Sequence, residues 1–184
     1  MIDKKAFRNS VMEKINSLPE EYLRSSNDGI FNNFISLEEY ASSETIFAYI
    51  SEKREPDTVR IIEKALSDGK RVALPISLPG GIMEPRLIES LDELVPGRYD
   101  IPAPKDTAPL VTDDEIDLII VPAVTFNEQG YRLGRGGGYY DRFLRKSAAY
   151  SVGLGRQELI MPVPLEEHDM GVKCLITEKN VYKY

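Results

Sequence analysis

Glycines and arginines gather in a short stretch of the chain, residues 132–141, where they could bind phosphate. Four glycines occupy five positions there, as Gly134, Gly136, Gly137 and Gly138. Glycine lets the backbone approach a ligand closely and adopt positive φ. Arg132 and Arg135 carry forked donors that suit phosphate oxygens, and the Asp141 carboxylate could hold a divalent cation. These residue types predict a loop that binds phosphate, with a metal ion beside it.

The spacing matches neither of two common phosphate motifs. A P-loop needs Gly-Lys-Ser or Gly-Lys-Thr after its glycines, and neither follows here. The dinucleotide-binding fingerprint needs a third glycine where this chain has Tyr139. The stretch is therefore a phosphate loop of another kind, or a flexible surface turn.

The position of the stretch in the chain favours the phosphate loop. The loop that contains it begins at residue 126, so that Asn127 belongs to the loop, and directly follows the most apolar run, residues 118–124, which reads as part of a buried strand ending at Phe126. It precedes a helical segment from about residue 138 to 146. Junctions between a strand and a helix are where α/β proteins bind phosphate. A bound phosphate would then face the positive end of this helix. The strand-like residues 150–154 complete a βαβ unit around the loop.

Another βαβ unit precedes this one. Residues 45–50 and 72–76 read as buried strands, and residues 57–67 between them form an amphipathic helix with Asp57 as its N-cap. Such a connection implies parallel strands and a right-handed crossover. The two units predict an α/β fold in a single domain that spans residues 1–184.

The remaining segments predict helices and strands around these units. Helices are expected at residues 3–18 and 19–34, a short turn at 37–41, an edge strand at 82–88, and strands at 174–177 and 181–182. The second helix is weakened by Asn27, Asp28 and Gly29. Residues 95–114 are rich in Pro, Gly, Asp and Thr without periodicity, and a stretch of that length predicts a functional loop or lid.

Two cations interrupt the apolar face of the first helix. Its buried stripe runs through Phe7, Val11, Ile15 and Leu18. At 100° per residue, Lys4 falls within this stripe and Arg8 at its margin. Either both side chains extend from the helix end into solvent, or the edge of the stripe borders an anionic ligand.

The composition limits the classes of function. A formal net charge of −7 argues against a general nucleic-acid binder, so an anionic ligand must be held by local positive charge. The lone Cys174 cannot form an intrachain disulfide, and neither Cys174 nor the lone His168 has an evident activating partner for nucleophilic catalysis. One cysteine and one histidine also cannot supply the usual nitrogen and sulfur ligands of a zinc site. Without a signal peptide or an apolar run near 18 residues, we expect a cytoplasmic enzyme with no membrane association.

Residues 132–141 closely resemble the signature of the 5-formyltetrahydrofolate cyclo-ligase family, also called 5,10-methenyltetrahydrofolate synthetases. The resemblance spans nearly the whole chain. It includes Lys4 with Arg8, the run Glu55-Pro56-Asp57-Thr58, the run Ile101-Pro102-Ala103-Pro104, and the region around Asp169-Met170. It implies a three-layer α/β/α fold with a mostly parallel, Rossmann-like open sheet, similar to sugar-phosphate isomerases and CoA transferases.

The resemblance also implies roles for individual residues. ATP would be bound by Lys4, Lys5, Arg8, Arg132, Leu133, Gly134, Arg135, Gly136, Gly137, Gly138, Tyr139 and Tyr140. The folate would contact Glu55, Tyr99, Arg135 and Tyr139, and Mg²⁺ would bind Asp141 and Asp169. Arg132 and Arg135 would be the catalytic residues. Many members of the family have lysine where this chain has Gly137, a difference that bears on phosphate affinity more than on function.

The implied reaction closes 5-formyltetrahydrofolate to 5,10-methenyltetrahydrofolate with ATP as co-substrate and Mg²⁺. Its partners would be these small molecules, and the chain would act as a monomer or a homodimer. Other hypotheses are a sugar-phosphate isomerase or acyl-CoA transferase without ATP dependence, and a folate or nucleotide sensor without turnover. RNA binding through the Arg-Gly segment is a further hypothesis, but it conflicts with the negative net charge of the chain.

Overall fold

A seven-stranded sheet forms the centre of the computed structural model, which describes residues 3–184 apart from the side chain of Tyr99. In spatial order its strands are β11 (Val181–Lys183), β10 (Cys174–Ile176), β9 (Tyr150–Leu154), β6 (Leu118–Val121), β1 (Thr45–Phe47), β2 (Arg71–Leu78) and β3 (Ile82–Ile88). The pairs from β10 through β2 are parallel, whereas β3 and β11 run antiparallel at the two edges. The predicted mostly parallel sheet and both βαβ units are confirmed.

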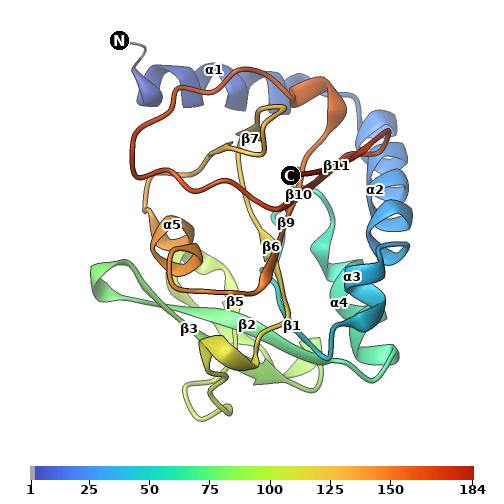
Figure 1. Ribbon diagram of the computed structural model, residues 1–184, viewed down its shortest axis with the longest axis vertical. Helices are drawn as coiled ribbons and strands as arrows, with labels where there is room; N and C mark the ends of the chain where they lie inside the picture. Colours follow the sequence, from blue (N-terminus) through green and yellow to red (C-terminus); the bar gives the residue numbers. More distant parts are fainter. Residues whose placement is uncertain (1–2) are drawn as a thin grey trace.

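Helices cover both faces of the sheet, as the resemblance implied (Figure 1). They are α1 (Lys4–Ser17), α2 (Glu20–Ile35), α3 (Glu38–Ser42), α4 (Thr58–Ser67) and α5 (Tyr139–Leu144). Asp3 and Asp57 cap α1 and α4, because their side chains accept hydrogen bonds from the amides of Lys5 and Arg60. Figure 1 shows α2, α3 and α4 on one side of the sheet, α5 on the other, and α1 across one end.

The apolar strand residues alternate between two cores. Ile46, Leu118 and Ile120 pack with α2 and α4, whereas Phe47, Ile119 and Val121 pack with α5. The ring centroids of Phe47 and Phe143 lie 5.0 Å apart and attach α5 to the sheet. Because α5 is short, loops complete the layer on its side, and these loops border the site described below.

The connection from β6 to α5 differs from the prediction. The chain does not pass directly from a strand to the glycine loop, because β7 (Thr125–Phe126) and β8 (Arg132–Leu133) first form an antiparallel hairpin. Its turn is held by Asn127, whose side-chain oxygen accepts from the amides of Gln129 and Tyr131. The helix after the loop is also shorter than residues 138–146, since it spans Tyr139–Leu144 and the amide of Lys146 bonds to the carbonyl of Phe143 in a tighter, 3₁₀-type turn.

The long loop at residues 95–114 divides into two parts. In the first, β4 (Val95–Pro96) pairs with β5 (Pro102–Ala103), around a 3₁₀ turn at Arg98–Asp100. In the second, the chain lies along the edge of β3, where Leu87 donates to the carbonyl of Pro109 and Val111 donates to that of Pro85. Only the first part borders the site, and the second covers a sheet edge.

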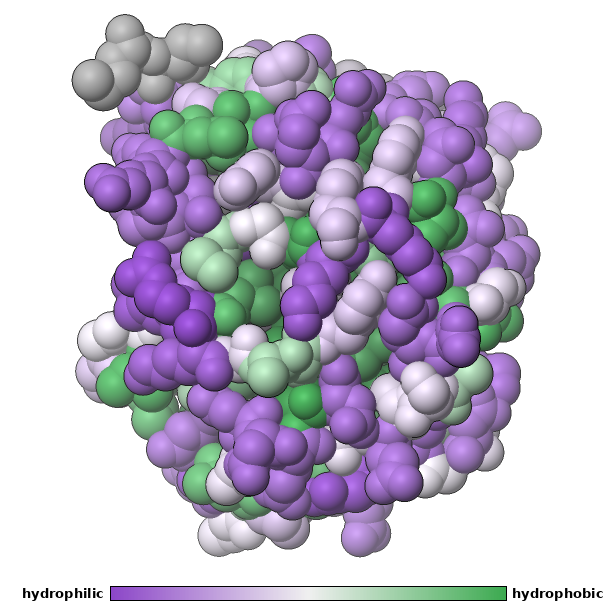
Figure 2. Space-filling model, viewed as in Figure 1, coloured by the Kyte–Doolittle hydropathy of each residue, from purple (hydrophilic) through white to green (hydrophobic). Residues whose placement is uncertain are grey.

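The surface is mainly hydrophilic. Figure 2 shows hydrophilic residues over most of one face, with hydrophobic residues in small groups between them. None of the helices within residues 3–184 has the length and apolar character needed to cross a bilayer.

Candidate active site

A cavity of about 670 Å³ opens beside the carboxyl ends of β1 and β6. Its walls contain nearly all of the predicted site residues: Lys4, Arg8, Glu55, Arg132, Leu133, Gly134, Arg135, Gly136, Gly137, Gly138, Tyr139, Tyr140, Asp141 and Asp169. We call it the glycine-loop cavity. Lys5 is exposed and does not line it, and the side chain of Tyr99 lies outside the described residues.

The backbone of the glycine loop, residues 134–138, is held by its carbonyl groups. Arg8 donates from Nε to the carbonyl oxygen of Gly134 at 2.8 Å, and Arg142 donates to that of Gly137. Gly136 and Gly138 have positive φ, at 99° and 64°. In the described part of the chain, no backbone N–H of residues 134–138 donates to a protein acceptor. The loop lines the cavity, and its N–H groups are therefore available to an anion, as in anion-binding backbone.

Arg132 is buried behind this loop and joins it to the chain around residue 170. It donates to Asp141 Oδ1 at 2.7 Å and to the carbonyl oxygen of Met170 at 2.6 Å. The amide of Met170 also donates to Asp141 Oδ1, at 3.2 Å. Asp141 and Asp169, which are far apart in the sequence, are thereby brought to one wall of the cavity.

Lys4 pairs with the acidic residues on that wall. Its Nζ lies 2.8 Å from Asp169 Oδ2 and 3.0 Å from Glu166 Oε2. Burial works to raise the pKa of Asp169, but the hydrogen bonds from Lys4 and from the Glu166 amide hold that pKa below its ordinary value. Ligand atoms of Glu166, His168 and Asp169 lie within 4.8 Å of one another. Carboxylate oxygens in this arrangement suit a hard cation such as Mg²⁺.

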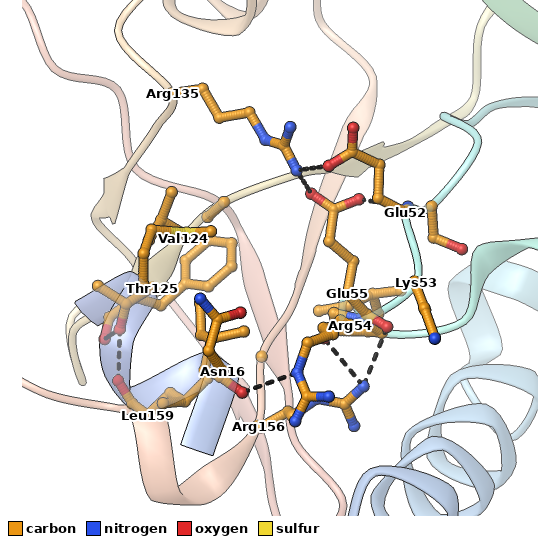
Figure 3. Close-up of a pocket in the computed structure, with 18 of the residues that line it drawn as sticks. Asn16, Glu52, Lys53, Arg54, Glu55, Val124, Thr125, Arg135, Arg156 and Leu159 are labelled. Atoms are coloured by element: carbon orange, nitrogen blue, oxygen red, sulfur yellow. Dashed lines mark hydrogen bonds and ion pairs between the residues drawn. The ribbon is translucent and has the colours of Figure 1, made fainter. Parts of the chain in front are cut away.

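Arg135 stands between the glycine-loop cavity and a neighbouring one. It makes ion pairs with Glu52 and with Glu55, the latter at 2.8 Å from Nη2 to Oε1, and its side chain is 53% exposed. The neighbouring cavity measures about 620 Å³ and shares Glu52, Glu55 and Arg135 with the first. Figure 3 shows the three charged groups converging at this boundary. A guanidinium here can contact a ligand in either cavity.

Tyr139 links the glycine loop to the neighbouring loops. Its hydroxyl lies 3.2 Å from Arg98 Nη1 and 3.4 Å from the carbonyl oxygen of Leu78. Tyr140 stacks on Phe47, with ring centroids 6.4 Å apart, and its buried hydroxyl has no partner in the described part of the chain. Burial raises the pKa of Tyr140, so its hydroxyl keeps its proton.

A family model for the 5-formyltetrahydrofolate cyclo-ligase family matches residues 1–178. The chain belongs to this family. It is 34% identical over 147 residues to the 5-formyltetrahydrofolate cyclo-ligase of Escherichia coli strain K12, covering 76% of this chain and 81% of that protein. It is 27% identical over 200 residues to the probable 5-formyltetrahydrofolate cyclo-ligase of Schizosaccharomyces pombe, and this match covers 99% of this chain and 98% of that protein.

A solved structure has the same fold. The NMR structure of Aquifex aeolicus 5,10-methenyltetrahydrofolate synthetase superposes with a TM-score of 0.87 at 31% identity, over 98% of this chain and 92% of that one. The chain is thus an enzyme of the cyclo-ligase family, and the predicted family and fold are confirmed.

Sequence reasoning missed two residues of this cyclo-ligase site. Glu52, which pairs with Arg135, lies in a charged loop whose contacts depend on the fold. Arg156 is 2% exposed and follows the end of β9. It donates to the carbonyl oxygens of Arg54 and Glu55 at 3.3 and 3.0 Å and so holds the loop that carries Glu55 (Figure 3). A charged residue directly after an apolar strand was the available signal.

Covalent catalysis by the chain's own nucleophiles finds no support in the cyclo-ligase structure. Cys174 is buried within β10, and burial raises the pKa of its thiol to about 11. The His168 side chain is 65% exposed and lies against Glu166. The prediction that neither residue is a catalytic nucleophile is consistent with these surroundings.

Proposed function

We propose that this chain catalyses the ATP-dependent closure of 5-formyltetrahydrofolate to 5,10-methenyltetrahydrofolate, with release of ADP and phosphate. The observation that carries the proposal is the glycine loop, whose backbone N–H groups have no acceptor among the described residues while Arg8 and Arg142 hold its carbonyl oxygens. Together with the cations Lys4, Arg8 and Arg135 around the same cavity, these donors suit a triphosphate. The printed names of the relatives and membership in the family support the folate substrate.

The chemistry explains why ATP and several cations are needed. The formyl oxygen on N5 is a poor leaving group, so the γ-phosphoryl group is transferred to it as the bond to ADP breaks. N10 of the same folate then attacks the formyl carbon and gives up its proton, the bond from this carbon to the phosphorylated oxygen breaks, and phosphate leaves with that proton. Both nucleophiles are substrate atoms, so the protein contributes positioning and charge neutralisation.

Arg135 is proposed to act at the boundary where the two substrates meet. ATP would place its phosphates on the glycine loop, and the folate would lie against Tyr139, Tyr99 and Glu55. Since Arg135 borders both cavities, its guanidinium can leave its glutamate partners and neutralise the transferred phosphoryl group. Arg132 is already bonded to Asp141 and Met170, and we propose that it contributes positive charge from behind the loop.

The proposed Mg²⁺ would bind Asp141 and Asp169. Both side chains line the glycine-loop cavity, and the Met170 amide ties Asp141 to the chain next to Asp169. Oxygen ligands on one wall fit this ion, which supplies charge to the phosphate oxygens when it is bound. Lys4 pairs with Asp169 at 2.8 Å and holds its pKa below the ordinary value, so the protein itself keeps this carboxylate ionised for a cation.

The test is to mix the purified protein with 5-formyltetrahydrofolate, ATP and Mg²⁺ and to follow the near-ultraviolet absorbance of the methenyl product. ATP-dependent growth of that band is the expected result, and a reaction without ATP serves as the control. A folded protein that binds ATP but forms no product would instead favour a sensor of folate or nucleotide. Product formation that does not depend on ATP would contradict the proposal.

A further inference from the structure

Arg142, outside the predicted site, joins the glycine loop to a distant part of the chain. From the exposed side of α5 it donates from Nε to the carbonyl oxygen of Gly81 at 3.0 Å and from Nη2 to that of Gly137. Gly81 lies in the 3₁₀ turn Pro79–Gly81, at the tip of the β2–β3 hairpin, whereas Gly137 lies in the glycine loop. One guanidinium therefore bridges two segments that the sequence separates by more than fifty positions.

The glycines around Arg142 leave it the space that it occupies. A Cβ atom at Gly81 would lie 1.7 Å from Arg142 Nη2, and one at Gly138 would lie 2.9 Å from Nη1. Real Cβ contacts are not that short, so a side chain at Gly81 would force the guanidinium out. The ring of Tyr139 lies on another side, with its centroid 5.8 Å from Arg142 Cζ. The absence of side chains at Gly81 and Gly138 thus lets the Arg142 guanidinium reach both carbonyl groups.

This bridge decides which backbone groups of the loop remain available. The guanidinium engages the carbonyl of Gly137 from one side, and Arg8 engages that of Gly134 from the other at 2.8 Å. A flexible run of glycines has many conformations, and only some present their N–H groups together. Arg8 and Arg142 bind two carbonyl groups of the loop and so reduce the number of conformations that it can adopt before a ligand binds. Such preorganisation raises the affinity of the loop for its ligand.

We propose that Arg142 is a positioning residue which, anchored on Gly81 of the β2–β3 hairpin, holds the glycine loop in its phosphate-binding conformation. The inference rests on the proposed function, because it takes the ligand of the loop to be the phosphates of ATP. Arg142 does not line the cavity, so it acts through the loop and not on the reacting atoms. Its loss should therefore impair ATP binding more than folate binding, because the folate is expected to reach this loop only through Tyr139 and Arg135.

The first test compares Arg142→Met and Arg142→Lys with the wild-type protein. Arg142→Met removes both donors, and we expect a rise of at least about tenfold in the KM for ATP, with a much smaller rise in the KM for 5-formyltetrahydrofolate. Arg142→Lys keeps the charge but loses the forked guanidinium, so its KM for ATP should lie between those of the wild type and Arg142→Met. If Arg142→Lys had the same KM for ATP as the wild type, the positive charge alone would matter, and the proposal would be overturned.

The second test leaves Arg142 in place and changes its anchor. Gly80 and Gly81 both have positive φ, at 77° and 74°, so alanine costs each position a similar backbone strain. A Cβ at Gly80 meets nothing within 4 Å, whereas one at Gly81 collides with Arg142. We expect Gly81→Ala to raise the KM for ATP as Arg142→Met does and Gly80→Ala to bind ATP like the wild type. Equal ATP affinities in the two alanine variants would refute the role of Arg142.

Direct titration of each folded variant with ATP and Mg²⁺ separates this inference from the function on which it rests. If the wild-type protein does not bind ATP, the proposed function fails and the role of Arg142 fails with it. If the wild type binds ATP and Arg142→Met binds it equally well, only the role of Arg142 is refuted. The glycine pair keeps the test decisive if Arg142→Met does not fold.

Discussion

Arg135 and Arg132 lie three positions apart and have different surroundings. The Arg132 side chain is 4% exposed and bonded to Asp141, so its removal would leave the half-buried Asp141 carboxylate without its cationic partner and would open a space in the protein. The Arg135 side chain is 53% exposed, and so is about half of its partner Glu52, whereas its other partner Glu55 is mostly buried. A loss of activity can therefore be assigned to chemistry more safely at Arg135.

We expect Arg135→Ala to lower turnover by about 10²- to 10³-fold, the effect of removing one group that stabilises transition-state charge. The melting temperature should stay within about 2 °C of the wild type, because exposed ion pairs contribute little to stability. Steady-state kinetics with ATP and 5-formyltetrahydrofolate would measure the first effect and calorimetry the second. Arg60→Ala, which removes another exposed ion pair, is the matched control and should leave turnover intact. Wild-type turnover in folded Arg135→Ala would disprove the catalytic role.

The pair of Lys4 and Asp169 predicts a pH dependence of stability. Because the pKa of folded Asp169 is lowered, the charged carboxylate stabilises the fold above its unfolded pKa, about 3.9, and this contribution disappears as pH falls through the folded pKa. Asp169→Asn should thus lower the free energy of unfolding by about 1 kcal/mol at pH 7, and the difference should vanish near pH 2. Urea unfolding from pH 2 to 7 would measure it, with the exposed Asp106→Asn as control. A difference independent of pH would contradict the assignment.

At the scale of elements, the sequence predicted regular segments better than turns. The bounds of β3 and β9 agree with the prediction because each is a continuous apolar or alternating run between turn residues. The hairpin of β7 and β8 was missed because its strands have only two residues each and Asn127 was assigned to the loop. Asn127 with Gly130, which has a φ of 80°, was the available turn signal.

The helix α2 runs without a break through Asn27, Asp28 and Gly29, contrary to the expected weakness. A Cβ atom at Gly29 would lie 2.7 Å from Glu178 Cβ and 2.9 Å from its Cα. Glycine is therefore required at position 29 because α2 packs closely against the turn after β10. Helix propensity alone does not take this tertiary contact into account. Tyr22 and Asn33 also bond to this turn, at 2.7 Å to Glu178 and 2.8 Å to Thr177.

Gly29→Ala should consequently destabilise the protein by about 1–3 kcal/mol, although alanine is favoured over glycine in a helix by about 1 kcal/mol. Asn32→Ala on the exposed side of the same helix is the control and should stabilise slightly. Denaturant midpoints at one pH would compare both variants with the wild type. Stabilisation by Gly29→Ala would show that the helix and the turn can move apart.

For the whole molecule, the sequence could predict which residue types gather but not every contact between them. Four residues from distant segments line one cavity, and the resemblance to the family alone predicts that they share a site: Lys4, Glu55, Asp141 and Asp169. The pairing of Arg135 with Glu52, and the bridge from Arg142 to Gly81, depend on the register of the sheet and on the β2–β3 hairpin. Neither has a local sequence pattern that would reveal it.

Because segments from both ends of the chain meet at the glycine-loop cavity, a ligand there should stabilise the whole fold. At 100 times its dissociation constant, MgATP would add about 2.7 kcal/mol, which raises the melting temperature of a domain of this size by about 5–10 °C. AMP at the same concentration should raise the melting temperature less than ATP does, because AMP has no β- or γ-phosphate for the loop.

Chelation of Mg²⁺ by EDTA should reduce the ATP-induced rise in melting temperature of the wild type but have little effect in Asp141→Asn or Asp169→Asn. Equal shifts for AMP and ATP would show that the glycine loop does not bind the terminal phosphates, and a wild-type shift insensitive to EDTA would remove the two aspartates from the metal site.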